Sequence, residues 1–223
     1  MTVRDNGANR VDGEAWSLSM AKSVMKRNPL LSRRWHYEPG VALLALAQVW
    51  ARTGNQSIFE FVKRNIDEFV GPGGSIRTYR RQEYNLDQIN EGKLLFLLSE
   101  TTADEGYREA AFLLREQLRT QPRTSEGGFW HKQIYPHQMW LDGIYMAAPF
   151  YAQFARQYSE PAALEDAIHQ IVLIEGHTRD PGTGLLYHAW DESRKQQWAD
   201  PETGCSPHFW GRAVGWYAMA IPD

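Results

Sequence analysis

Residues Met139–Phe150 read MWLDGIYMAAPF and are the most informative stretch of the chain. Asp142 stands in it between a tryptophan and a glycine, at the head of a strongly apolar helical run. Burial disfavours the charged form of a carboxyl group, so an acid in such a position needs a partner or a function. Asp142 is therefore the first candidate for a catalytic acid. The alternative is that it caps the N-terminus of the helix.

Around this stretch, the spacing of apolar residues predicts an all-α protein with eight helices and no long strand. The expected helices cover residues 15–27, 37–52, 56–70, 86–101, 107–120, 139–157, 161–176 and 209–221. Short extended pieces are expected at 74–79, 127–134 and 185–190. The third helix ends at a Gly-Pro-Gly-Gly run, which is a strong helix breaker.

The predicted helices alternate between two kinds. The second, fourth, sixth and eighth are apolar and rich in small residues, whereas the third, fifth and seventh are amphipathic. Gly40, Gly92 and Gly143 lie near the starts of three apolar helices and are 52 and 51 residues apart. A period near 50 with two helices per unit predicts a ring of α-hairpins in a single domain over residues 1–223, with the apolar helices inside. Glycine near each inner start lets crowded backbones approach.

Composition limits the classes of function. The net charge of −3 and the pI near 6.2 give no sign of a nucleic-acid or anionic-membrane partner. The polar N-terminus predicts no signal peptide, and no apolar run approaches the roughly 20 residues that span a bilayer. With the single Cys205, these features predict a cytoplasmic protein. Aromatic residues make up 13%, with nine Trp, which fits either sugar binding or bulky helix packing.

Polar and aromatic residues cluster where the inner helices begin, and helix dipoles favour anionic ligands at such ends. These residue types are typical of a carbohydrate site, and an acidic sugar would suit such a site. The residues are Asp87, Asp142, His131, His137, His188, Trp140, Trp210 and Arg212. When two carboxyl groups lie close together, the charge of one raises the pKa of the other, which can then act as a general acid. Each residue also has a structural reading. Asp87 can cap a helix, the histidines can be structural or exposed, and Arg212 can either clamp a carboxylate or pair with a neighbouring helix. No metal-binding histidine spacing occurs, so no metal site is predicted.

Four blocks of the sequence resemble glycoside hydrolase family 105, the unsaturated rhamnogalacturonyl hydrolases. The blocks are FWH at 129–131, QMWLDGIYMAAPF at 138–150, GLLYHAWD at 184–191 and FWGRAVGW at 209–216. The likeness runs from about Trp35 to the end of the chain. Family 88, the unsaturated glucuronyl hydrolases, shares the fold and the chemistry, and the Met-Ala-x-Pro-Phe continuation favours family 105.

The resemblance implies an (α/α)6 barrel and a glycosidase that needs no cofactor. Its substrate would be a lyase-generated pectin oligosaccharide with a 4,5-unsaturated galacturonic acid at the non-reducing end. Asp142 corresponds to the general acid/base that hydrates the double bond, and Asp87 to a second aspartate that orients the substrate or tunes Asp142. The matching substrate-binding residues are His131, His188, Trp210 and Arg212, with Trp140 beside them and Tyr37 as a stacking platform.

The chain departs from the family in length, because an (α/α)6 barrel has twelve helices. We therefore expect about two C-terminal hairpins to be missing. Four alternatives stay open: an unsaturated glucuronyl hydrolase acting on glycosaminoglycan disaccharides, a two-carboxylate glycosidase, an inactive sugar-binding remnant, and a helical-repeat scaffold. The scaffold hypothesis predicts that the candidate residues do not converge.

Overall fold

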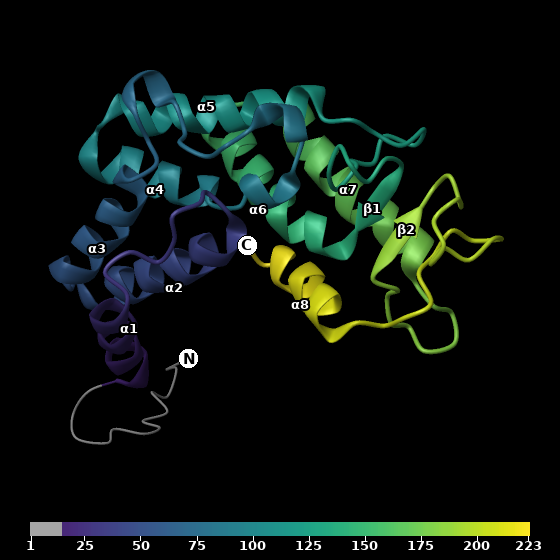
Figure 1. The fold of residues 1–223 in the computed structure, drawn as a ribbon, viewed down its shortest axis with the longest axis horizontal. Helices are drawn as coiled ribbons and strands as arrows, with labels where there is room; N and C mark the ends of the chain where they lie inside the picture. The colour runs from purple at the N-terminus through teal and green to yellow at the C-terminus, as the bar shows by residue number, and fades with distance from the viewer. Residues whose placement is uncertain (1–14) are drawn as a thin grey trace, which may run out of the picture.

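The computed structural model describes residues 15–223, which form eight α-helices and one pair of short strands (Figure 1). The expectation about a signal peptide falls on residues outside this range. The helices are α1 (Trp16–Arg27), α2 (Tyr37–Thr53), α3 (Gln56–Asp67), α4 (Gly92–Thr102), α5 (Glu105–Thr120), α6 (Leu141–Gln157), α7 (Pro161–Thr178) and α8 (Gly211–Ala220). Eight predicted helices are thus confirmed. No helix in residues 15–223 is long and apolar enough to cross a membrane.

The helices pack as consecutive hairpins along an arc. Each of α2, α4 and α6 contacts the next apolar helix, and α1, α3, α5 and α7 pack on the outside against their neighbours in sequence. Figure 1 shows the outer helices following one another from α1 through α3 and α5 to α7, with α2, α4, α6 and α8 within. The predicted division into inner and outer helices is confirmed.

Burial distinguishes the middle of the arc from its ends. The inner helix α6 buries 13 of its 17 residues, whereas the outer helix α7 buries 5 of 18. The inner helices at the two ends of the arc bury much less, 5 of 17 residues in α2 and 2 of 10 in α8. Because an inner helix of a closed ring has neighbours on both sides, the open flanks of α2 and α8 mark the ring as incomplete.

All three periodic glycines sit where a side chain would collide with a neighbour. A Cβ atom on Gly92 would lie 2.6 Å from Cδ2 of Phe150 on α6, and one on Gly143 would lie 2.8 Å from Nδ1 of His131. A Cβ on Gly40 would overlap the Glu91 side chain. The close approach predicted for these three positions is therefore present.

Five helix starts differ from the prediction, and the causes of two of these differences are visible in the structure. The helix expected over 86–101 begins at Gly92, and Leu86–Gln88 form a separate 3-10 turn, η3. The side chain of Asn85 causes this by accepting the backbone N–H of Asp87 at 3.0 Å, which starts a local turn. The helix expected from residue 139 begins at Leu141, because β1 (Gln138–Trp140) pairs antiparallel with β2 (Ala189–Asp191).

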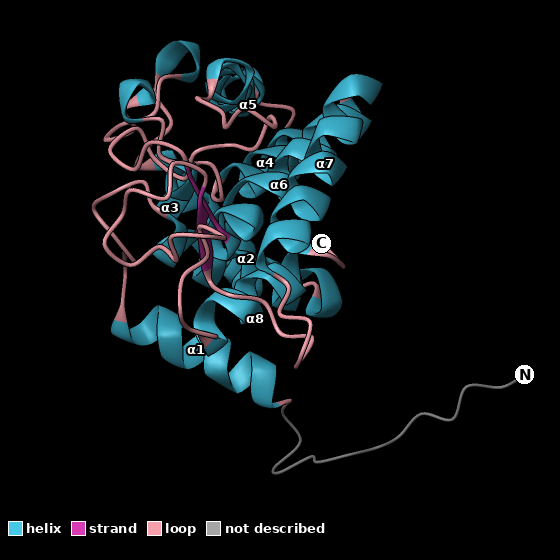
Figure 2. Ribbon diagram, turned by 90° about the vertical axis from the view of Figure 1, so that its right-hand side faces the viewer, coloured by secondary structure: helices cyan, strands magenta, loops and turns pink. Residues whose placement is uncertain are grey.

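The loops and this strand pair gather on one side of the helices (Figure 2). Trp140 ends β1 and is the N-terminal boundary residue of α6, and its register partner in β2 is Ala189. The backbone N–H of Leu141 also donates to the carbonyl oxygen of His188 at 3.0 Å. These bonds fix the start of α6, and with it Asp142, against the 188–191 segment.

Candidate active site

Asp142 lies in the first turn of α6 and is 5% exposed. Its Oδ1 atom is 2.8 Å from Nη2 of Arg212 on α8, and its Oδ2 atom is buried without a hydrogen-bond partner. The boundary residue of α6 is Trp140, which makes no side-chain cap, so Asp142 is not the helix cap that the sequence also allowed. A buried carboxylate oxygen without a partner is costly, which makes Oδ2 available to a ligand.

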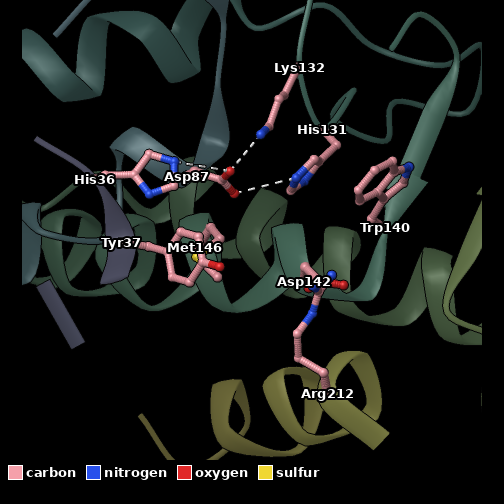
Figure 3. A pocket seen from close by; sticks show the side chains of 9 residues that line it. All are labelled: His36, Tyr37, Asp87, His131, Lys132, Trp140, Asp142, Met146 and Arg212. Atoms are coloured by element: carbon pink, nitrogen blue, oxygen red, sulfur yellow. Dashed lines mark ion pairs between the residues drawn. The ribbon is translucent and has the colours of Figure 1, made fainter. Parts of the chain in front are cut away.

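Asp87 is buried at the centre of a cluster of basic groups. Its Oδ1 lies 3.4 Å from Nε2 of His131, and its Oδ2 lies 2.6 Å from Nζ of Lys132 and 3.6 Å from Nε2 of His36 (Figure 3). Burial by itself raises the pKa of Asp87, but the hydrogen bond to His131 and the charge of Lys132 outweigh it and hold the pKa well below the usual range. Asp87 is therefore an anion at neutral pH and cannot serve as a proton donor there.

A stack of three rings holds His131 in place. The imidazole of His131 lies 4.7 Å from the Trp140 ring with 9° between their planes, and Tyr135 stacks on the same ring at 5.0 Å and 14°. The indole N–H of Trp140 donates to Oε1 of Gln138 at 3.1 Å. Because stacking and hydrogen bonding restrict these rings, Nε2 of His131 stays directed at Asp87.

One cavity of about 260 Å³ joins these groups. Of the predicted site residues, it is lined by Tyr37, Asp87, His131, Trp140, Asp142 and Arg212. Figure 3 shows the Asp87 cluster on one side and Asp142 with Arg212 on the other, with Tyr37 from α2 at the left of the view. The residues come from loops and helices far apart in the sequence. Their convergence removes the observation on which the scaffold hypothesis depended.

Three further residues line the cavity and were not predicted: His36, Lys132 and Met146. Met146 is four residues after Asp142 on α6, so helical geometry places both on one face. Lys132 and His36 are sequence neighbours of the predicted His131 and Tyr37. Their position next to predicted residues was the only signal in the sequence, because the contacts of both side chains with Asp87 depend on tertiary packing.

His188 and Trp210 do not line this cavity. Nδ1 of His188 lies 2.8 Å from Oγ of Ser206, and its ring meets Trp210 edge to face at 5.8 Å. Burial lowers the pKa of His188, only partly opposed by a hydrogen bond with the His208 backbone, which favours the neutral ring at pH 7. The Trp210 ring carries the Arg212 guanidinium at 3.6 Å. Trp210 thus contacts Arg212 directly, and His188 packs against Trp210.

His137, the remaining histidine of the predicted cluster, lies outside the cavity lining. Its Nδ1 is 3.5 Å from Oε2 of Glu192. Among residues 15–223, no group of three or more His, Cys, Asp or Glu side chains is arranged to hold a metal ion.

Comparison with known proteins gives the family. Residues 16–223 match the model of Glycosyl Hydrolase Family 88. The chain is 28% identical over 209 residues to the unsaturated rhamnogalacturonyl hydrolase YesR of Bacillus subtilis, a match that covers 91% of this chain and 57% of that protein.

Comparison with solved structures points to the same group of enzymes. A glycoside hydrolase of family 105 from C. acetobutylicum ATCC 824 superposes with a TM-score of 0.90 at 45% identity, over 93% of this chain and 57% of that one. A possible family 105 member from Klebsiella pneumoniae shares the fold with a TM-score of 0.77 at 21% identity, over 100% of this chain and 63% of that one. The fold is the all-α hairpin barrel. This chain spans about three fifths of the length of these relatives. The chain belongs to glycosyl hydrolase family 88.

Proposed function

We propose that this chain carries the site of an unsaturated uronyl hydrolase, which releases 4,5-unsaturated galacturonic acid from the non-reducing end of lyase-generated rhamnogalacturonan oligosaccharides. The observation that carries the proposal is the Asp142 carboxyl group. One of its oxygens is bound to Arg212 and the other is buried without a hydrogen-bond partner, and the residue lines a cavity of about 260 Å³. The rhamnogalacturonan substrate is supported by the likeness to YesR and to family 105.

Asp142 is the general acid/base of this reaction. It donates a proton to C4 of the unsaturated ring, which leaves an oxocarbenium ion at C5. A water molecule adds at C5 and returns a proton to Asp142. The resulting hemiketal opens to a ketone at C5, and the hemiacetal left at C1 expels the remaining sugar chain. One water molecule is consumed and the carboxyl group is regenerated, so no second carboxylate has to act as a nucleophile.

Arg212 pairs with Asp142 and is also open to a substrate. Its side chain is 41% exposed, so a substrate carboxylate can reach the guanidinium. A carboxylate bound there weakens the hold of Arg212 on Asp142 and places a negative charge beside it.

Asp87 has an orienting role. As an anion held by Lys132 and His131, it keeps these donors on the wall opposite Asp142. Donors fixed before the substrate arrives need no reorganisation during the reaction. The standard two-carboxylate mechanism requires one carboxyl group to protonate the leaving oxygen, and the low pKa of Asp87 argues against that role.

The experiment that tests the proposal is loss of ultraviolet absorbance from the conjugated double bond. Unsaturated rhamnogalacturonan disaccharide and unsaturated chondroitin disaccharide are assayed side by side. The proposal predicts faster turnover of the rhamnogalacturonan disaccharide. A preference for the chondroitin disaccharide would support a glucuronyl hydrolase instead, and calorimetric binding without turnover would support an inactive sugar-binding site.

We place the reaction in the cytoplasm, because the single buried cysteine fits a reducing compartment.

A further inference from the structure

A second cavity, of about 480 Å³, lies next to the first. His36 lines both cavities. Between them stands the 3-10 turn η3, whose Asp87 belongs to the first cavity, while Gln88 and the preceding Asn85 belong to the second. The two cavities therefore share His36 and are lined by adjacent residues of one short turn. A ligand that extends past His36 from the first cavity enters the second.

The second cavity carries two arginines with weakly engaged guanidinium groups. Arg34 is exposed and forms no ion pair with any residue in 15–223. Nη1 of Arg80 lies 3.5 Å from Oε1 of Glu83, in a pair whose side chains are 75% and 47% exposed. Exposed pairs of this kind contribute little, so a ligand carboxylate can displace Glu83. Arginine suits such a ligand because its planar fork binds both carboxylate oxygens.

Hydrogen bonds fix the second cavity to the first. Oε1 of Gln88 accepts the backbone N–H of Arg80 at 3.3 Å, which ties the arginine segment to the turn that carries Asp87. Oδ1 of Asn85 accepts the backbone N–H of Asp87 at 3.0 Å, which leaves the amide NH₂ group of Asn85 as a donor for a hydroxyl group. The spacing between the two cavities is thus set by the fold.

We propose that the second cavity binds the leaving part of an acidic oligosaccharide, and that Arg34 and Arg80 hold the carboxylate of a second uronic acid. The inference rests on the proposed function, because the first cavity must hold the terminal unsaturated uronate. That sugar is at the non-reducing end, so the rest of the chain leaves the cavity in a single direction. In a chain that alternates uronate with a neutral sugar, the next carboxylate belongs to the third sugar.

The test is calorimetry with unsaturated rhamnogalacturonan disaccharide and tetrasaccharide, in an Asp142→Asn background that prevents turnover. The tetrasaccharide should bind about tenfold more tightly than the disaccharide, as expected for one charged hydrogen-bonded contact. R34Q/R80Q should remove this gain and leave disaccharide binding unchanged. The matched control is R33Q/R52Q, which makes the same change in charge at exposed arginines outside the cavity and should keep the gain.

The outcomes separate this inference from the proposed function. Equal affinity for the two lengths, or equal weakening of both by R34Q/R80Q, would overturn the role of the second cavity. A tetrasaccharide that binds through Arg34 and Arg80 while the disaccharide does not bind would support the second cavity and count against the assignment of the first. Absence of binding by both lengths would overturn both.

Discussion

The guanidinium group of Arg212 on α8 lies 2.8 Å from Oδ1 of Asp142 on α6. This pair is the shortest ion pair within the first cavity after that of Lys132 with Asp87. Trp210 covers one face of the guanidinium at 3.6 Å, so Arg212 is held by an aromatic ring and a carboxylate together. The pair leaves Oδ2 as the oxygen of Asp142 that can act on a substrate.

Asp142→Asn should lower turnover of the unsaturated disaccharide by roughly 10²–10⁴-fold, the usual contribution of a general acid/base. The amide keeps the shape of the side chain but neither donates nor recovers the required proton. Turnover is followed by ultraviolet absorbance, and circular dichroism checks that the helices remain. The control is Glu165→Gln, an exposed residue of α7, which should leave turnover unchanged. Full activity in Asp142→Asn would remove Asp142 from the mechanism.

Arg212→Lys should raise KM about tenfold, with a smaller effect on kcat. Lysine keeps the positive charge but loses the planar fork that binds a carboxylate and the stacking on Trp210. Steady-state kinetics on the disaccharide measures both constants, and Arg156→Lys, exposed near the end of α6, is the control. An unchanged KM would show that the substrate carboxylate binds elsewhere.

Asp87→Asn should remove part of the acid sensitivity of folding. The pKa of Asp87 is lower in the folded chain than the value of about 3.9 expected when unfolded, so the unfolded chain takes up this proton first as the pH falls. The stabilisation from Asp87 is present above about pH 4 and is lost below it. Urea unfolding at pH 7, 5, 4 and 3 should show a shallower fall in the variant. The same slope in both proteins would contradict the lowered pKa.

Glu91→Gln should stabilise the fold at neutral pH and have little effect near pH 4. Glu91 is 1% exposed, and burial raises its pKa well above the usual value, against a hydrogen bond with the His36 backbone. A raised pKa favours the folded state fully below the unfolded value, and this contribution is lost as the pH rises above about 4.5. The free energy of unfolding, measured from pH 4 to 8, should therefore fall less in the variant. Equal losses would indicate that Glu91 titrates normally.

Gly92→Ala should destabilise the fold by about 1–3 kcal/mol, the usual cost of overpacking a core. The added methyl group would meet the Phe150 ring at 2.6 Å and Leu114 at 2.7 Å. Gly215→Ala in α8 is the matched control, since nothing lies within 4 Å of its added Cβ. That substitution should stabilise by about 0.5–1 kcal/mol through helix propensity. Thermal unfolding of the two variants gives the comparison.

Much of the fold was predictable because it depends on local sequence. Helical periodicity located all eight helices of residues 15–223, and Pro161 marked the start of α7. The spacing of the glycines predicted that inner helices begin near Gly92 and Gly143, because only a residue without a side chain fits the contacts at these positions. The start of α4 was wrong because Asn85 forms a hydrogen bond two residues ahead and stops the helical pattern from extending back to Leu86.

The site was predictable only in part, because its key pairs are tertiary. Asp142 was singled out by its apolar surroundings in the sequence itself. The three basic partners of Asp87 come from other segments, and nothing near Asp87 in the chain indicates them. His188 and Trp210 matched family positions, yet the contacts of Trp210 with His188 and with Arg212 depend on the tertiary fold.

The two ends of the arc have a consequence for the order in which the site forms. Tyr37 on α2 and Trp216 on α8 meet edge to face with ring centres 6.0 Å apart, and Tyr37 and Arg212 line the same cavity. During synthesis the N-terminal hairpins emerge and pack first. Asp142 is then left without its guanidinium until α8 has left the ribosome and docked. Asp142 therefore gains its arginine partner only after the hairpins that precede α8 have been synthesised.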